Sequence, residues 1–220
     1  MAKTKVEESF EAARGPSVAT TPKRGKSMLE SILFLAAMTL LLGGAYPLVV
    51  TGIAQIAFSW QANGSLMVQR GRVIGSRLIG QYFDEAGYFW GRPSATSPNP
   101  YDGSLSSGSN LTPAGSALEK AIEARVRALR DAQKAAGAHP ATVELPVPAD
   151  LVTASGSGLD PDISPAAAYY QVDRVAAARN LPRATVRALV SKHIRGRTFG
   201  VLGEPRVNVL ELNLALDRLQ

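Results

Sequence analysis

Few side chains in this sequence could carry out catalytic or metal chemistry, and their spacing favours neither. The chain has no cysteine, which excludes disulfides, thiolate metal sites and thiol catalysis. Neither His139 nor His193 has a second imidazole at ligand spacing, so a zinc site has no support. No serine occupies a Gly-x-Ser-x-Gly elbow, because Ser155 stands where a nucleophilic Ser157 would need a glycine. The sequence therefore predicts no catalytic, cofactor-binding or metal-binding residue, and no enzyme acting alone.

One acidic stretch imitates a cation-binding loop. Asp160, Asp162 and Ser164 have the spacing of the first three ligands of a calcium loop. The sixth position, where a glycine must make the turn, is Pro165, and the twelfth is Gln171 in place of glutamate. The better interpretation is a helix start, with Ser164 as the N-cap and Pro165 in the first turn.

The dominant element is an apolar stretch from Ile32 to Trp60, and no residue between Ser31 and Gln69 carries a charge. A helix needs about 20 apolar residues to cross a bilayer, and this stretch exceeds that length. The alternatives are a buried helix of a soluble protein and a cleaved signal peptide, whose apolar region would be about 7 to 15 residues. The sequence predicts a permanent transmembrane anchor over residues 28–60.

Charges flanking the anchor predict its orientation. Lys23, Arg24 and Lys26 precede it and are opposed by Glu30 alone, whereas the first charge beyond it is Arg70. Because positive residues stay in the cytoplasm, we expect a flexible cytoplasmic tail over residues 1–27 and an exported domain over residues 61–220. The chain would then be a single-pass protein of the cell inner membrane, surrounded by lipid.

Small and polar side chains recur along the anchor. Pro47 removes a backbone donor and crowds the carbonyl of Gly43, so with Gly44 it predicts a kink. Small residues let helices approach closely, and polar ones hydrogen-bond in lipid. The stripe thus predicts contact with a partner helix through Gly43, Gly44, Pro47, Thr51 and Gln55. The alternative is that glycine and proline are simply common in membrane helices.

The sequence after the anchor predicts an exported α+β domain of short strands, a helical hairpin and a C-terminal helix. Apolar pieces at 66–68, 73–74 and 78–79 indicate short strands, and residues 91–113 a loop that is ordered only if something packs on it. Ser116 and Glu119 suggest a capping box for an amphipathic helix that stops at Gly137. Proline breaks alternate with short extended pieces over 139–164. A hairpin of two helices is expected over 165–179 and 182–194, and the leucines of 210–219 fit a helix or a strand.

The charge balance excludes nucleic acid as a partner. The chain has 24 basic and 18 acidic side chains, a net charge of +6. The basic residues do not form a stripe interleaved with aromatics, which nucleic-acid surfaces usually show.

Several strings, taken together, resemble one family. These are GAYPLVVTGIAQ with QANGSL, GYFWGRPSATSPNPYD with SGSNL, SGLDPDIS with AAYYQVDRVAAARNL, and GEPRVNVLELNLALD. They are similar to the C subunit of the Kdp-type potassium-transporting P-type ATPase and cover Leu42 to Gln220 in the family's order. The sequence departs at Asp162, where the family often has histidine, and at Ser107, where glycine is expected.

The resemblance implies a non-catalytic subunit of a complex that imports potassium at the expense of ATP. The implied partners are a channel-like, potassium-binding A subunit, a P-type ATPase B subunit and a small F subunit. Potassium and ATP belong to the complex, although the subunit is credited with raising ATP affinity as a catalytic chaperone. The residues that the resemblance marks as structural or interface positions are Gln61, Asn63, Tyr88, Trp90, Arg92, Pro93, Asn110, Asp160, Pro161, Asp173, Arg174, Glu204, Arg206, Asn208 and Asn213.

Two points stay open at this stage. An exported domain conflicts with a direct role at ATP, so an ordered loop is the better interpretation of residues 105–108. A free-standing, membrane-anchored sensor or binding domain is the alternative to a transporter subunit. The acidic residues Asp84, Glu85, Asp160 and Asp162 could attract a cation, but the part after the anchor has 18 basic and 14 acidic side chains. We therefore expect scaffolding in preference to electrostatic steering.

Overall fold

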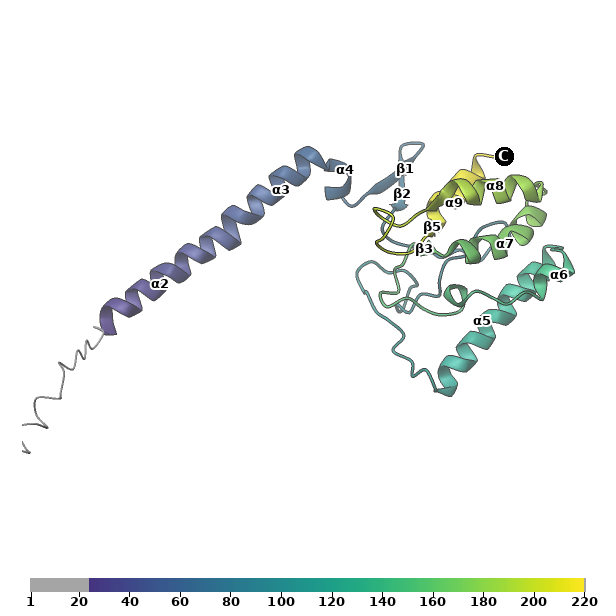
Figure 1. The fold of residues 1–220 in the computed structure, drawn as a ribbon, viewed down its shortest axis with the longest axis horizontal. Helices are drawn as coiled ribbons and strands as arrows, with labels where there is room; N and C mark the ends of the chain where they lie inside the picture. Colours follow the sequence, from purple (N-terminus) through teal and green to yellow (C-terminus); the bar gives the residue numbers. More distant parts are fainter. Residues whose placement is uncertain (1–23, 220) are drawn as a thin grey trace, which may run out of the picture. The chain divides into compact units, whose positions relative to one another are not determined.

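The computed structural model describes residues 24–219, and the side chains from Met28 onward. The chain divides into two compact units with the boundary between Ser59 and Trp60. Unit 1 is a helical rod, and unit 2 is an α+β domain (Figure 1). Residues 1–23 of the tail predicted over residues 1–27 lie outside the described residues, and the helix α2 already begins at Arg24.

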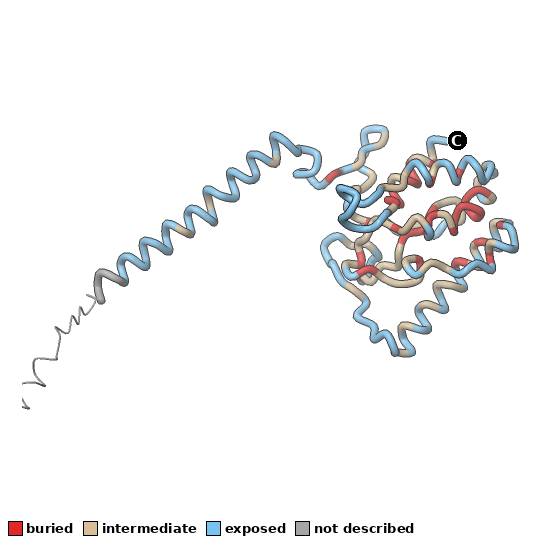
Figure 2. The backbone as a smooth tube through the Cα atoms, viewed as in Figure 1, coloured by how far each residue is buried: buried red, intermediate tan, exposed pale blue. Residues whose placement is uncertain are grey.

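Unit 1 consists of α2 (Arg24–Leu40), the π-helix η1 (Leu41–Ala45) and α3 (Tyr46–Ala57). Residues 28–57 are long and apolar enough to cross a membrane, and none of this stretch is buried (Figure 2). The Tyr46 amide donates to the Leu41 carbonyl five residues back, which is the π pattern. This wide turn stands immediately before Pro47, where the missing donor and the ring disturb α-helical bonding.

The short helix α4 (Ser59–Ala62) spans the boundary, and unit 2 continues with a hairpin of β1 (Leu66–Gln69) and β2 (Arg72–Ser76). The strands are antiparallel, and Val68 pairs with Val73. Arg70 and Gly71 form the turn with φ of 49° and 77°, the left-handed values that a tight hairpin requires. The first two predicted strands are confirmed. Residues 78–79 are a turn and not a strand, since no other strand pairs with them.

The core of unit 2 lies between three helices and a small sheet. The helices are α7 (Pro165–Ala178), α8 (Arg183–His193) and α9 (Val209–Asp217). The sheet has the order β3 (Asp162–Ile163), β5 (Arg206–Asn208), β4 (Ile194–Arg195), and both pairings are antiparallel. Val175, Val186 and Leu212 are fully buried among them. Figure 2 shows the buried backbone concentrated along α7 and its neighbours.

The predicted helical hairpin and its cap are confirmed. Ser164 Oγ accepts the amide of Ala167, and Pro165 opens α7. The facing residues of the two helices are buried or half-buried, namely Val172, Val175, Val186, Leu189 and Val190. The C-terminal leucines form a helix, so the strand alternative is wrong. Asn208 caps α9 by accepting the Glu211 amide.

The long amphipathic helix α5 (Ser116–Ala135) forms as predicted, but its start differs. Gly115 is the N-cap and no side chain caps the helix, so the capping box is wrong: Ser116 already lies inside the first turn. Gly137 ends the helix with φ of 75°, as expected. The expected extended pieces after it are partly replaced by α6 (Pro140–Val143) and the 3-10 turn η2 (Ala149–Leu151).

The proline-rich loop over 91–113 is ordered by its own hydroxyl groups. Ser94 Oγ donates to the Gly158 carbonyl at 2.7 Å and accepts the Tyr101 amide at 2.8 Å. Thr96 Oγ1 donates to the Asn99 carbonyl at 2.6 Å. The Ser107 amide donates to the Ser157 carbonyl at 2.9 Å, so residues 105–108 are an ordered loop packed on the segment before β3.

Candidate functional site

A segment without helix or strand structure, residues 87–92, lies at the centre of unit 2, and its residues 89–91 are buried. Asn213 of α9 accepts the Phe89 amide at 2.9 Å and donates to its carbonyl at 3.0 Å. Gln171 of α7 does the same for Trp90, at 2.8 and 3.1 Å. Two side-chain amides thereby satisfy the backbone groups that a neighbouring strand would otherwise pair. Both amides are buried, so each bond is shielded from water.

The Trp90 ring lies close to two guanidinium groups. The central carbon of Arg174 is 4.6 Å from the ring centroid and that of Arg125 is 5.1 Å away. Arg174 has no exposed surface, and it donates to the carbonyls of Glu85 and Ala86 and to Gln171 Oε1. Burial lowers its pKa to about 9, and the neighbouring Arg125 charge acts in the same direction.

No carboxylate in the described part of the chain forms an ion pair with Arg174. Carbonyl dipoles and the face of an aromatic ring therefore replace a counter-ion. This arrangement fixes the backbone of residues 85–86 and the plane of the indole together. Arg125 extends it by donating to the Leu151 and Gly91 carbonyls, at 3.1 and 3.2 Å. The centre is a frame for the loop, in which most of these side-chain donors are directed to the chain's own backbone.

A second cluster lies at the surface and is ionic. Arg92 pairs with Asp160 at 3.1 Å, and Arg206 pairs with Asp162 at the same distance. These four side chains, with Glu204, line a depression of about 570 Å³. Burial raises the pKa of Asp162, with a smaller contribution from the Asp160 charge. An arginine stands beside each of the two aspartates, which weakens any attraction of the depression for a cation.

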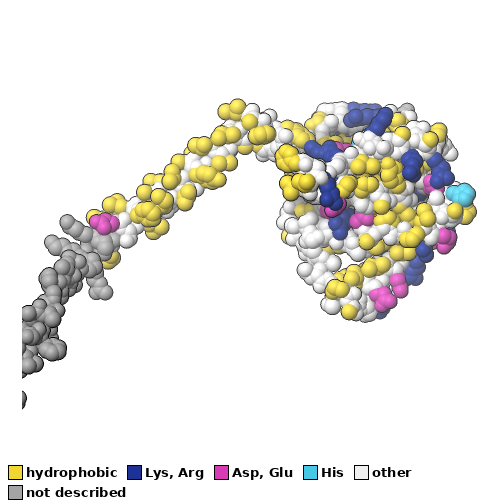
Figure 3. Space-filling view, viewed as in Figure 1, with side chains coloured by type: hydrophobic (Ala, Val, Ile, Leu, Met, Phe, Trp, Pro, Cys, Tyr) yellow, Lys and Arg dark blue, Asp and Glu magenta, His cyan; other side chains and the backbone are white. Residues whose placement is uncertain are grey.

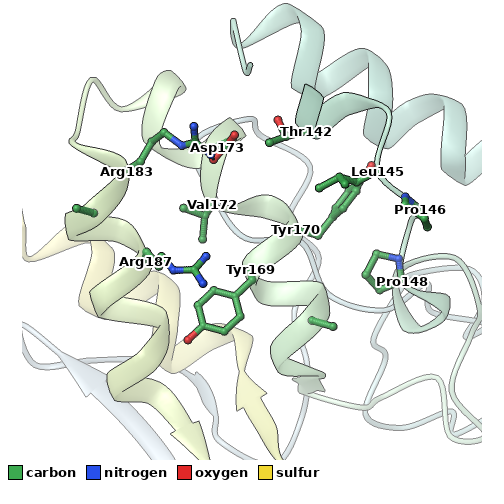
Figure 4. A pocket seen from close by; sticks show the side chains of 12 residues that line it. Thr142, Leu145, Pro146, Pro148, Tyr169, Tyr170, Val172, Asp173, Arg183 and Arg187 are labelled. Carbon is green, nitrogen blue, oxygen red and sulfur yellow. The ribbon is translucent and has the colours of Figure 1, made fainter. Parts of the chain in front are cut away.

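A larger cavity of about 650 Å³ lies between α7, α8 and the segment after α6 (Figure 4). Its wall is mainly apolar, with Leu145 and Pro146 facing α7. Asp173 pairs with Arg183 across it at 2.5 Å. Arg187 lies over the Tyr169 ring at 4.6 Å from the centroid. The four-residue spacing of the two arginines on α8 was the available sequence signal for this face.

The structure brings only some of the family-motif residues together. Trp90, Arg174 and Asn213 meet in the central frame, and Arg92, Asp160 and Arg206 in the ionic cluster. Tyr88 lies outside both, with its ring against Arg179 and its hydroxyl donating to Asp217. Glu204 pairs with Arg197 on an exposed loop, and Asp173 lines the larger cavity. The others lie apart: Gln61 and Asn63 near the start of unit 2, Pro93 beside α5, Asn110 in the loop with φ of 49°, Pro161 accepting the Val209 amide, and Asn208 bonded to the Arg77 carbonyl.

Sequence reasoning missed two residues of the central frame. Gln171 was considered only as a failed calcium ligand, yet it bonds Trp90 and Arg174 at once. Arg125 was read as part of a helix, yet it reaches Gly91 across the domain. A buried polar residue inside an otherwise apolar helical face was the signal for Gln171, since such a group requires partners.

Residues of the anchor stripe follow one another along unit 1. A Cβ added at Gly43 or Gly44 would meet nothing within 4 Å. Both glycines belong to η1, and Pro47, Thr51 and Gln55 follow on α3. Thr51 and Pro47 are exposed. Room for larger side chains at the glycines means that the chain's own packing does not require them.

Comparisons with known proteins agree with the resemblance. A family model described as "K+-transporting ATPase, c chain" matches residues 28–218. A protein of Sorangium cellulosum is 59% identical over 85% of this chain and 95% of its own length. One of Paraburkholderia phytofirmans is 57% identical over 86% and 95%, and one of Ralstonia nicotianae is 52% identical over 93% and 97%. Each of these relatives is named a potassium-transporting ATPase KdpC subunit. The chain belongs to the KdpC family, the c chain of K+-transporting ATPases.

Proposed function

We propose that this chain is the non-catalytic scaffold subunit of an ATP-driven potassium uptake complex. It holds the channel-like A subunit and the P-type ATPase B subunit, with the small F subunit, in a competent arrangement, and its exported domain shapes the outer potassium entrance. Potassium and ATP are handled by the complex and not by this chain. The names of the relatives support the complex, and the internal use of the motif residues supports the scaffold.

The observation that carries the proposal is the central frame. Asn213, Gln171 and Arg174 direct their polar atoms to the backbone of residues 85–90. Side chains committed in this way stabilise one surface shape and leave little polar chemistry for a substrate. A subunit of this kind changes flux only through binding energy, by favouring the competent state of its partners.

Orientation gives the first test of the proposal. Protease added to intact spheroplasts should remove unit 2 and spare a tag at the N-terminus, because Lys23, Arg24 and Lys26 retain the tail in the cytoplasm. Immunoblots against the tag and against unit 2 provide the measurement, and detergent-permeabilised cells provide the control. Protection of unit 2 in intact spheroplasts would reverse the topology and support direct contact with ATP, the catalytic-chaperone alternative.

Steering of potassium by exposed carboxylates gives a second test. Four acids could attract a cation, namely Asp84, Glu85, Asp160 and Asp162. Asp160 and Asp162 are each paired with an arginine, and Asp84 and Glu85 are exposed. We expect that neutralising all four changes the apparent Michaelis constant for potassium less than about twofold even at low ionic strength, where screening is weakest, because two of them are paired with arginines and the part after the anchor is net positive. Potassium uptake is measured against external potassium at low and high salt.

A matched control neutralises Glu123 and Asp131, which are exposed on α5. A large rise in the Michaelis constant that appears only at low salt, with the complex intact and the control normal, would establish steering. Loss of assembly in the fourfold variant would instead support the scaffold, because two of the four carboxylates belong to ion pairs that fix the surface around Arg92 and Arg206.

A further inference from the structure

An exposed loop between β4 and β5 presents an apolar tip to its surroundings. Residues 196–205, called the apolar loop below, include Phe199, Val201 and Leu202. Phe199 is 89% exposed, and Val201 is 71% exposed. Single exposed apolar residues are ordinary, but three within four positions at one tip form a patch, and such patches mark interaction sites.

Backbone hydrogen bonds and an ion pair hold the tip of this loop in a defined conformation. Thr198 and Leu202 exchange two backbone hydrogen bonds of 2.8 and 2.9 Å. Arg197 donates to both carboxylate oxygens of Glu204, at 2.7 and 2.8 Å, and so closes the base of the loop. Phe199 lies between these pairs with φ of 54°, a left-handed value that is costly for an aromatic residue. The backbone is therefore strained at Phe199, in the conformation that leaves its aromatic ring exposed.

Contacts within unit 2 connect the base of this loop to the hairpin and to Trp60, the first residue of the unit. Glu211 pairs with Arg195, where the loop begins, at 2.6 Å and with Arg77, where the hairpin ends, at 3.2 Å. Trp60, the first residue of unit 2, is bonded to the same end of the hairpin, because its indole donates at 2.8 Å to the carbonyl of Leu66, which pairs with Ser76. Only two residues separate Trp60 from the last residue of α3, Ala57. In Figure 1 the apolar loop, drawn in yellow, lies on the side of unit 2 where the chain enters it.

The hairpin adds a second apolar surface and the charges. Leu66, Val68 and Val73 are all exposed, and the last two are cross-strand partners. Arg70 and Arg72 stand at the turn, and the sequence has no acidic residue between Glu30 and Asp84. Figure 3 shows hydrophobic and basic side chains next to one another on this side of unit 2. Exposed apolar groups with neighbouring arginines are typical of segments that lie in the bilayer interface.

We propose that the apolar loop and the outer face of the β1–β2 hairpin insert into the headgroup region of the outer leaflet around the span. Phe199, Val201 and Val68 enter the boundary with the acyl chains, and Arg70 and Arg72 meet lipid phosphates. The short tether after α3 and the absence of acidic residues from the hairpin favour anionic lipid over a protein groove as the occupant. The inference depends on the span crossing a membrane, and it is independent of which partner subunits bind.

The test uses single cysteines, because the chain has none of its own. Phe199→Cys and, in a second variant, Val201→Cys are labelled with bimane, and the full-length chain is reconstituted in vesicles containing phosphatidylglycerol. Lipids brominated near the headgroup should lower the fluorescence of both labels about twofold. Leu145→Cys, an exposed apolar position after α6, is the matched control and should be unaffected.

Other outcomes would overturn the proposal. Equal quenching by aqueous iodide in vesicles and in detergent would place the tip in water. Protection from iodide that appears only in the assembled complex, without quenching by brominated lipid, would assign the patch to a partner subunit. Copurification of the labelled variants with the complex is measured in parallel, so that failure of the lipid contact is distinguished from failure of the scaffold role.

Discussion

Replacing Asn213 by alanine will lower the free energy of unfolding of the full-length chain by about 3 kcal/mol. The change leaves the Phe89 amide and carbonyl buried without partners, and each unsatisfied backbone group costs about 1 to 3 kcal/mol. Because a domain's whole stability is about 5 to 15 kcal/mol, this loss is a large share. Urea unfolding in detergent, followed by tryptophan fluorescence, measures the shift through the adjacent Trp90.

The matched control is Asn99→Ala, which removes the same side chain from an exposed loop position. We expect its effect to stay within about 0.5 kcal/mol, as for most surface substitutions. Equal unfolding midpoints for the two variants would show that the amide of Asn213 does not hold residue 89. A scaffold role adds a second readout, because the destabilised domain should also lower the yield of intact complex.

The second large effect is expected in the membrane. Replacing Gly43 and Gly44 together by leucine should abolish copurification with the channel-like subunit, because added bulk prevents close helix approach. The isolated chain has room for both side chains, since a Cβ at either position meets nothing within 4 Å. Membrane insertion should therefore survive, and carbonate extraction followed by affinity purification of the complex separates the two.

Gly52→Leu is the control for this variant. It lies on the same span, and a Cβ there also meets nothing within 4 Å, but it is not one of the stripe residues. If the double variant copurifies as well as this control, the glycines serve only the π-turn. If wild-type chain copurifies with no transporter subunit at all, the free-standing sensor becomes the better interpretation.

Local chemistry made much of the architecture predictable. An uncharged apolar stretch predicts a span, and Ser164 with Pro165 predicts the start of α7. The predicted capping box was wrong because Gly115 takes the extended conformation of an N-cap. Ser116 is therefore the first residue of the helix and not its cap. The strand predicted at residues 78–79 was wrong because two apolar residues carry no information about whether a partner strand exists.

The central frame could not be predicted because its partners are far apart in the sequence. Asn213 bonds a residue 124 positions away, and Gln171 bonds one 81 positions away. No periodicity links such pairs, since each amide looks like an ordinary polar residue on a helix. The resemblance marked Trp90, Arg174 and Asn213 as important, but only the fold shows that their shared task is to hold one segment of backbone.

The amide bridges at Phe89 and Trp90 also bear on aggregation. An extended segment normally offers a row of free N–H and C=O groups that can recruit a strand from another chain. Here the two side-chain amides occupy those groups from within, at 2.8 to 3.1 Å, so the apolar sequence around Phe89 has no free edge to template a fibre. Loss of either amide would therefore free backbone groups of this apolar segment, and would make it prone to pair with a strand of another chain whenever the domain opens.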